Sequence, residues 1–247
     1  MIQNADVATE KTPRKKKIRH IVAAVLLGII VIYIVSGAIF WKIGMPAFMF
    51  KYEKNDKGGI TITDYLGPYL QVHIPDKIEG LEVTEIGEFA FSDYEADRDN
   101  SNNFKAHCRF TIKKNIREVI IPDSVEKIGA FAFDHCENLT NVNMPSSLRE
   151  IELDAFSDTK IKELDLPEGM TKIDYHAFAF LIYLERITLP DSIEEIDRAA
   201  FDTCRNLKEI NVPAGLKRVG EYAFYGTGLS DEQKQAFYDK AEEVIED

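Results

Sequence analysis

Apolar and polar residues recur at fixed intervals over most of the chain. Short segments of alternating apolar and polar residues each end at a proline, and successive prolines are 23, 22, 23 and 23 residues apart, at Pro122, Pro145, Pro167, Pro190 and Pro213. Apolar residues stand three and six positions after each proline. An Ala-Phe pair then completes each unit, with phenylalanines at Phe133, Phe156, Phe178, Phe201 and Phe224. A period of this length predicts a solenoid.

The pattern within one unit predicts one coil of that solenoid. In the segment NVNM before Pro145, Val142 and Met144 should face inward and Asn141 and Asn143 outward, as in a short strand. Proline lacks a backbone donor and disfavours helix before it, so it ends the strand. The alanine fits where backbones crowd, and the phenylalanine fills the centre of the coil. Stacked coils would then bury one another's apolar residues, with the phenylalanine rings in one column.

One further match to the pattern ends at Pro75 and raises the number of expected coils to six, over residues 58–229. Pro75 and Pro122 are 47 residues apart, about twice the period, so we expect an insertion at 92–115. Its polar first half is expected to form a loop, and its second half contains CRFTIK, which alternates like an edge strand. The inserted loop is either functional or neutral, since loops on rigid scaffolds often carry binding residues.

Both ends of a solenoid need covers. Residues 48–65 predict two strands around a turn at 55–59, which would form an N-terminal cap. We assign 42–57 to a juxtamembrane linker and the start of this cap. Residues 230–247 predict a C-terminal capping helix, because Ser230 and Gln233 have the spacing of a capping box. Its expected buried face is made of Phe237, Ala241, Val244 and Ile245. We expect a lid over the last coil rather than a partner-binding helix.

The segment 21–41 contains 21 residues without a charge. As a helix it would be about 31 Å long, which matches a hydrocarbon core of about 30 Å. Basic residues between Arg14 and Arg19 precede it, so the positive-inside rule predicts a cytoplasmic basic tail at 1–20, a transmembrane helix at 21–41 and an extracellular remainder. The alternative is a signal peptide that is cleaved near Ser36-Gly37-Ala38.

Charge divides the chain in the same way. Residues 1–42 carry seven bases and two acids, and the rest carries 23 bases and 40 acids. An acidic body argues against nucleic acid as a partner. Hydrophobic residues make up 45% of the chain, which is typical of a folded core.

The unit IPDSVEKIGAFAFDHCENLTNVNMP and its counterpart LPDSIEEIDRAAFDTCRNLKEINVP resemble the BspA-type leucine-rich repeat of bacterial surface proteins. The resemblance extends over about residues 58–229. It implies a mostly β solenoid of leucine-rich-repeat type, with about six coils of 22–23 residues, after one transmembrane helix and before a C-terminal helix. It implies no catalytic residues, and five or six coils are few for a long-reaching adhesin.

Candidate chemistry is sparse. Cys136 and Cys204 hold the same place in different coils, about 14 Å apart at about 4.8 Å per strand, too far for a disulfide, and are expected to be buried apolar residues. Cys108 lies in the insertion, where it is either free or paired between molecules. The five histidines are scattered, and no familiar catalytic or metal-binding spacing is present. We therefore expect no enzyme activity, no catalytic or metal site and no cofactor.

The remaining candidate site is the outward face of the strands before the prolines. One row holds Asn143, Asp165, Thr188 and Asn211, and the next row holds Glu163, Arg186 and Glu209. We expect a monomeric ectodomain, tethered to a bacterial cell membrane by one helix, that binds a protein or glycan through this face in adhesion or recognition. The alternative is a structural or assembly role beside another membrane protein of the same cell envelope.

Overall fold

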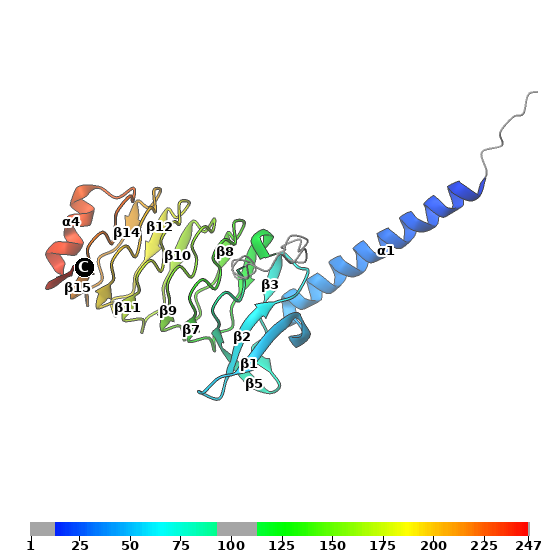
Figure 1. Cartoon of the computed structure of the whole chain (residues 1–247), viewed down its shortest axis with the longest axis horizontal. Helices are drawn as coiled ribbons and strands as arrows, with labels where there is room; N and C mark the ends of the chain where they lie inside the picture. Colours follow the sequence, from blue (N-terminus) through cyan, green and yellow to red (C-terminus); the bar gives the residue numbers. More distant parts are fainter. Residues whose placement is uncertain (1–12, 93–112, 247) are drawn as a thin grey trace, which may run out of the picture.

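The computed structural model describes residues 13–92 and 113–246. A long helix, α1 (Pro13–Ile43), projects from one end of a β solenoid, and a short helix, α4 (Asp231–Lys240), covers the other end (Figure 1). The expected insertion falls mostly outside the described residues, as does Cys108. Its last residues form the 3₁₀ turn η2 (Lys113–Asn115).

Each coil contributes one short strand to each of two sides. The strands that precede the prolines are β3 (Gln71–His73), β6 (Glu118–Ile120), β8 (Asn141–Val142), β10 (Glu163–Asp165), β12 (Arg186–Thr188) and β14 (Glu209–Ile210). The other side holds β2 (Ile60–Tyr65), β5 (Leu81–Ile86), β7 (Lys127–Ile128), β9 (Glu150–Ile151), β11 (Lys172–Ile173), β13 (Glu195–Ile196), β15 (Arg218–Gly220) and β16 (Glu243–Ile245). Successive coils pair in parallel, so residues at equivalent repeat positions lie side by side.

The predicted phenylalanine column is confirmed. Six rings stack along the interior with centroids 4.9, 5.2, 6.4, 5.5 and 5.6 Å apart and planes within 18° of parallel, in the order Phe91, Phe133, Phe156, Phe178, Phe201 and Phe224. All six are buried, and the alanine before each of them is fully buried. The column continues to Tyr65 before Phe91 and to Phe237 after Phe224. The repeat spacing therefore produces one continuous core.

The N-terminal cap adds a turn. Strands β1 (Phe50–Lys54) and β2 form an antiparallel hairpin, as the alternation predicts, and β2 also pairs in parallel with β5. The short strand β4 (Lys77–Ile78) pairs with β5 in the longer first repeat. Because β2 makes a winding of its own, the described residues form about seven turns rather than about six.

The solenoid contains a discontinuity that we call the seam, between the coil of Phe156 and the coil of Phe178. The described strands before the prolines form two sheets, β3-β6-β8 and β10-β12-β14, and the opposite side divides between β9 and β11. The coil before the seam is the one whose prolines are 22 residues apart, and Phe156 and Ile161 are five positions apart where other coils have six. The widest ring spacing in the column, 6.4 Å, lies at the same place. One missing residue therefore disturbs both sides of the spiral.

A guanidinium bridges the seam. Arg149 donates hydrogen bonds to the carbonyl oxygens of Ser146 and Leu148 on its own coil, at 3.1 and 2.8 Å, and to that of Glu168 on the next, at 3.2 Å. Among the described residues, the buried hydroxyl of Thr159 on the short coil has no hydrogen-bond partner. The seam is thus held by this side chain and by the backbone hydrogen bond from the N–H of Lys160 to the carbonyl of Leu139, where other steps of the spiral have paired strands.

The C-terminal prediction is right about the cap and wrong about the length of the helix. The hydroxyl of Ser230 accepts a hydrogen bond from the backbone of Gln233, and the capping box is complete. The helix ends at Lys240, and Val244 and Ile245 lie in β16, which pairs in parallel with β15. These β-branched residues fit a strand, and the backbone groups of β16 cover the open edge of the last coil. Phe237 is buried as expected, but Val244 is 44% exposed.

Candidate functional site

The strands place the seven predicted face residues in the expected rows, divided by the seam. Glu163, Arg186 and Glu209 are in register on β10, β12 and β14, and Asp165 pairs with Thr188. Asn143 lies on the other side of the seam, just after β8. Whether this face binds a ligand stays a prediction, but the contacts of each side chain indicate which polar groups remain available to a ligand.

Two of the seven residues are engaged with the backbone. The amide of Asn211 accepts a hydrogen bond from the N–H of Leu189 and donates one to its carbonyl, both at 2.8 Å. Asn143 does the same to Ile121, at 2.7 and 2.8 Å. At the equivalent step the backbone N–H of Leu166 donates directly to the carbonyl of Thr188. The asparagine amides therefore replace backbone pairing between coils.

Three more of the seven form an ion-pair cluster. The guanidinium of Arg186 lies 2.9 Å from the carboxylate of Glu163 and 2.6 Å from that of Asp165, and it also donates to the hydroxyl of Thr188. The hydrogen bond from Arg186 is the main reason that the pKa of Asp165 lies below its ordinary value. The single guanidinium offsets one of the two carboxylate charges, and Glu209 lies exposed beside the cluster.

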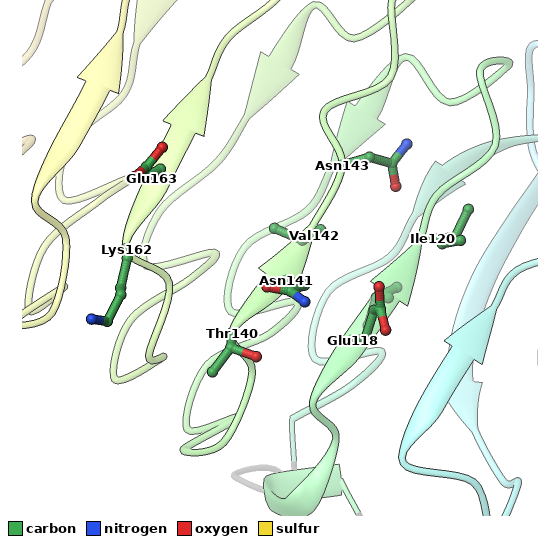
Figure 2. A pocket seen from close by; sticks show the side chains of 9 residues that line it. Glu118, Ile120, Thr140, Asn141, Val142, Asn143, Lys162 and Glu163 are labelled. Carbon is green, nitrogen blue, oxygen red and sulfur yellow. The ribbon is translucent and has the colours of Figure 1, made fainter.

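A shallow depression of about 600 Å³ crosses the same face (Figure 2). Its walls come from β6 and β8 on one side and from Lys162 and Glu163 on the other, so it opens at the seam. Hydroxyl, amide, ammonium and carboxylate groups line it, including those of Thr140 and Asn141. Such a lining suits a polar ligand, and the one-residue shortening of the coil positions it.

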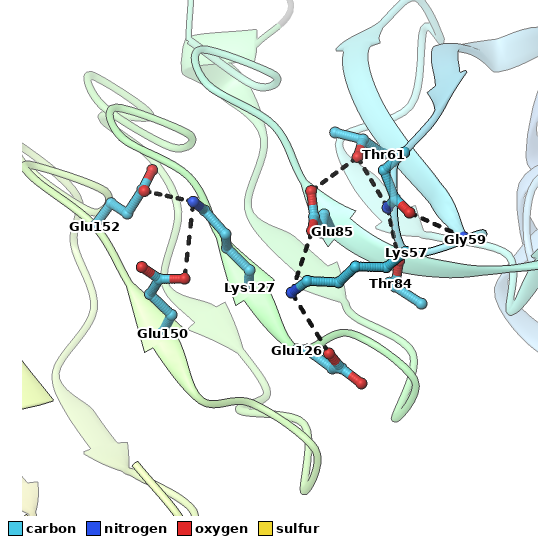
Figure 3. A network of polar contacts seen from close by, with 10 residues as sticks. Lys57, Gly59, Thr61, Thr84, Glu85, Glu126, Lys127, Glu150 and Glu152 are labelled. Atoms are coloured by element: carbon cyan, nitrogen blue, oxygen red, sulfur yellow. Dashed lines mark hydrogen bonds and ion pairs between the residues drawn. The ribbon is translucent and has the colours of Figure 1, made fainter. Parts of the chain in front are cut away.

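The opposite side of the solenoid carries a row of alternating charges. Neighbouring strands place Lys127 beside Glu150 and Glu85, and Lys57 from the cap hairpin reaches Glu85 and Glu126 at 3.6 and 3.8 Å (Figure 3). Beyond the seam the row continues as Lys172, Glu195, Arg218 and Glu243. Opposite charges on neighbouring strands stabilise the register.

Lys172 has the densest set of partners in this row. Its ammonium lies within 3.0 Å of three carboxylates, those of Asp174, Glu195 and Asp197. Burial tends to lower the pKa of Lys172, but hydrogen bonds to these carboxylates outweigh it and raise the pKa. Because the charges satisfy one another, we assign this row to stability rather than to ligand binding. The five prolines already reveal five members of the row, since Lys127, Glu150, Lys172, Glu195 and Arg218 each stand five positions after one of them.

A group of exposed, mostly aromatic side chains lies on the coils of Phe178 and Phe224, toward the end that α4 covers. We call it the distal patch, and it consists of residues that are 37–66% exposed, namely Tyr175, Phe180, Ile182, Tyr183, Tyr222 and Tyr225. Tyr175 stacks on His176, whose ring meets Phe180 edge-on, and the guanidinium of Arg198 lies 5.9 Å from the ring of Tyr175. Tyr222 and Tyr225 contact each other edge-on at 6.2 Å.

Two of these aromatic residues have a left-handed backbone. Phe180 and Tyr222 have φ of +59° and +58°, a left-handed conformation that recurs two positions after and two positions before the column phenylalanines. Hydrogen bonds from Phe180 to Asp202 and from Thr203 to Tyr225 tie the last three coils together at this corner. A hollow of about 490 Å³ beside Tyr222 and Tyr225 is also lined by Lys234 and Tyr238.

The interpretation of the sequence missed the distal patch, because it searched only the strand face for aromatic residues. The available signal is the repeat position itself. Aromatic residues stand within two positions of the Ala-Phe pair in four of the six Phe-bearing coils, among them Phe89, Phe131, Phe180 and the pair Tyr222 and Tyr225. This signal does not tell which of them are exposed, because Phe89 is buried.

The two described cysteines are buried, as the sequence predicts. The thiols of Cys136 and Cys204 donate hydrogen bonds to the carbonyls of Phe91 and Phe178. Burial raises the pKa of Cys204 to about 12, so its thiol is unreactive at neutral pH. Within the described ranges, no group of three or more histidine, cysteine or acidic side chains has the geometry of a metal site.

The repeats themselves decide the family. A family model described as the BspA type leucine-rich repeat region matches residues 104–230 in six copies. The chain belongs to this family. BspA-type proteins are cell-surface proteins, and leucine-rich repeats are typically non-enzymatic scaffolds. In the described part of the chain, one helix, from Val22 to Phe40, is long and apolar enough for a membrane span, a test that a signal sequence also passes.

Solved structures include similar leucine-rich repeat proteins. A leucine-rich repeat protein of T. pallidum is 28% identical, with 81% of each chain covered and a TM-score of 0.64. A leucine-rich repeat protein from Bacteroides ovatus is 21% identical, covering 75% of this chain and 57% of that one, with a TM-score of 0.38. A leucine-rich cell surface protein from Faecalibacterium prausnitzii is 20% identical, covering 72% and 54%, with a TM-score of 0.43. None of the curated proteins matches this chain.

Proposed function

We propose that this chain is a single-pass protein of a bacterial cell membrane whose extracellular repeat domain binds a protein or glycan without catalysis. The observation that carries this proposal is the distal patch, a group of exposed aromatic side chains on the coils far from α1 (Figure 1). A soluble domain gains nothing in stability from leaving such rings in water. Their position suits contact with a partner away from the membrane.

Aromatic side chains are suited to recognition. Tyrosine offers a large rigid surface with one polar end, and tyrosine and arginine are enriched among the residues that dominate binding energy. Tyr222 and Tyr225 lie beside a hollow, with the ammonium of Lys234 at its rim. Arg198 adds a cation next to Tyr175. The strand face, by contrast, engages Arg186 and two asparagines internally, so we rank it second.

The orientation follows from the charges around α1. The basic residues between Arg14 and Arg19 favour a cytoplasmic N-terminus. Cleavage near Ala38 would remove Tyr33 and Ser36, which contact Tyr69 in the folded domain. We therefore propose that the helix is retained as an anchor.

The test compares two variants of the full chain in lipid nanodiscs, on glycan arrays and against purified surface proteins. The first variant carries Tyr222→Ser and Tyr225→Ser, and the matched control carries Glu163→Gln and Glu209→Gln on the strand face. We expect the tyrosine variant to bind the selected ligand at least about tenfold more weakly, since one well-packed aromatic contact contributes more than about 1.4 kcal/mol. We expect the control to bind normally. The opposite result would move the site to the strand face.

The second candidate function is an assembly role beside another membrane protein of the same cell. The packing of Tyr69 against α1 favours it, because the domain then stays close to its own membrane. A photo-crosslinking residue in place of Tyr222 distinguishes the two roles in intact cells. Cross-links only to a neighbouring membrane protein would support assembly and contradict external recognition.

A further inference from the structure

Exposed apolar side chains of the described repeat domain occur at a second place, beside α1. Phe48 in the 3₁₀ turn η1 (Ala47–Met49) is 75% exposed, and Leu66 is 49% exposed. The backbone N–H of Leu66 donates to the carbonyl of Met49, so the two segments are neighbours. Met49 itself is buried, which means that the turn is packed into the domain while Phe48 points outward. We call Phe48 and Leu66 the basal pair.

The loop next to the basal pair packs along α1. The ring of Tyr69 stacks on Tyr33 at 4.8 Å and meets Phe40 edge-on at 5.7 Å. The hydroxyls of Tyr69 and Ser36 share a hydrogen bond of 2.6 Å, and Tyr33 donates to the carbonyl of Pro68 at 3.1 Å.

Small residues and a short connection fix this packing. Gly37 allows the close approach, since an added Cβ would lie 3.3 Å from the Tyr69 ring. Two residues after the helix, the backbone N–H of Met45 already donates to the carbonyl of His73. Helix and domain are therefore joined by packed contacts rather than by a free linker.

These contacts fix the depth of the loop relative to the apolar helix. The apolar segment runs from Val22 to Phe40, or 19 residues, which is about 28 Å and therefore slightly shorter than a hydrocarbon core of about 30 Å. Tyr33 precedes Phe40 by seven residues, or about 10 Å along the axis. A loop that contacts both residues must lie level with the outer part of this segment. That level extends from the outer boundary of the hydrocarbon core to about 10 Å below it, within the outer leaflet.

We infer that the base of the repeat domain inserts into the outer leaflet of the same membrane, with Phe48 and Leu66 at the boundary of headgroups and acyl chains. This inference rests on the proposed membrane span. The nearest acid along the chain does not oppose insertion, because the carboxylate of Asp64 is neutralised by Lys51 at 2.8 Å and Lys113 at 2.6 Å. The domain is then fixed on the bilayer by two attachments, α1 and the basal pair.

The experiment measures depth in the full chain reconstituted into phosphatidylcholine vesicles. Trp41 is the only tryptophan, so a Trp41→Phe background allows one new reporter at a time. The test variant adds Phe48→Trp, and the matched control adds Tyr225→Trp, at a residue that is 66% exposed at the far end. Lipids brominated near the headgroup end of the acyl chain quench tryptophan on contact. We expect quenching in the test variant to be several-fold stronger than in the control.

Trp41 in the unmodified chain separates this inference from the proposed span. If Trp41 is quenched and the Phe48→Trp reporter is quenched no more than the control, the helix spans the bilayer and the basal insertion is overturned. If Trp41 is not quenched, the proposed span fails and the insertion fails with it. Strong quenching of both Trp41 and the Phe48→Trp reporter, with an unquenched control, supports the inference.

Discussion

Replacing Asn211 with alanine tests whether side-chain amides hold neighbouring coils together. The Asn211 amide makes two hydrogen bonds of 2.8 Å with the backbone of Leu189, one as acceptor and one as donor. Leu189 is 2% exposed, so water reaches its backbone groups poorly after the amide is removed. The substitution therefore removes two links between coils without enlarging the apolar core.

The expected loss of stability follows from the number of bonds. A hydrogen bond contributes about 1 kcal/mol net, and a buried group left without a partner loses about 1–3 kcal/mol. Loss of the two bonds, which lie at the solvent-facing rim, should lower the free energy of unfolding by about 2 kcal/mol. In a domain of this size that corresponds to a decrease in Tm of about 4–8 °C.

The assay is urea unfolding of the full chain in detergent micelles, followed by the near-ultraviolet circular dichroism of the tyrosine rings. Thr188→Ala is the matched control, because it lies in the same row while the link there runs through the backbone, from the N–H of Leu166 to the carbonyl of Thr188. We expect that control to change stability by less than about 0.5 kcal/mol. Asn211→Asp should fall between the two, since a carboxylate can still accept from Leu189 N–H but cannot donate to its carbonyl. If Asn211→Ala is no less stable than Thr188→Ala, the amide link is unimportant and the reasoning is wrong.

Three further predictions concern the core, the cap and a thiol. Phe201→Ala should reduce the free energy of unfolding by about 3–5 kcal/mol, because the buried ring lies 5.5 and 5.6 Å from its column neighbours. The control Tyr225→Ala should change it by less than about 0.5 kcal/mol. Equal losses of stability for the two variants in urea titrations would contradict the stabilising role of the column. Burial tends to raise the pKa of Asp64, but hydrogen bonds from Lys113 and Lys51 lower it below the ordinary value of 3.8. The contribution of Asp64 to stability is therefore complete above pH 3.8 and is lost as the pH falls through the pKa of the folded state. The stability difference between wild type and Asp64→Asn should therefore shrink below about pH 4. A difference that persists at pH 2 would show that it does not come from the ion pairs of Asp64 with the two lysines. Cys204 should react with a thiol reagent at pH 8 only at the rate of unfolding, and rapid labelling of native protein would show that its coil opens.

Much of the architecture can be predicted from spacing alone. Phe133 and Phe201 stack in one column because equivalent positions of a solenoid must coincide, and no other knowledge is needed to place them. The fate of Val244 and Ile245 could not be read in the same way. Their spacing from Phe237 fits one face of a helix, yet their β-branched side chains fit a strand, and the open edge of β15 decides between the two.

The candidate site was less accessible to sequence analysis. Register predicts which residues share the strand face, but it does not show that the amide of Asn143 turns onto the backbone of Ile121 or that Arg186 is shared by two carboxylates. Phe180 resembles a core residue in the sequence. In the structure it is 39% exposed, at a corner where its N–H donates to the carbonyl of Asp202 on the next coil.

The seam has a mechanical consequence. A surface protein held in the bilayer at one end and by a partner at the other would carry tension along the axis of its spiral. Tension parts a stack at its weakest joint, and here that joint follows the coil of Phe156, where the strands of both sides change sheets and Arg149 spans the gap. Under load the molecule would separate into a membrane-proximal half and a ligand-bearing half before either half lost its own windings, and the short coil would act as a mechanical fuse.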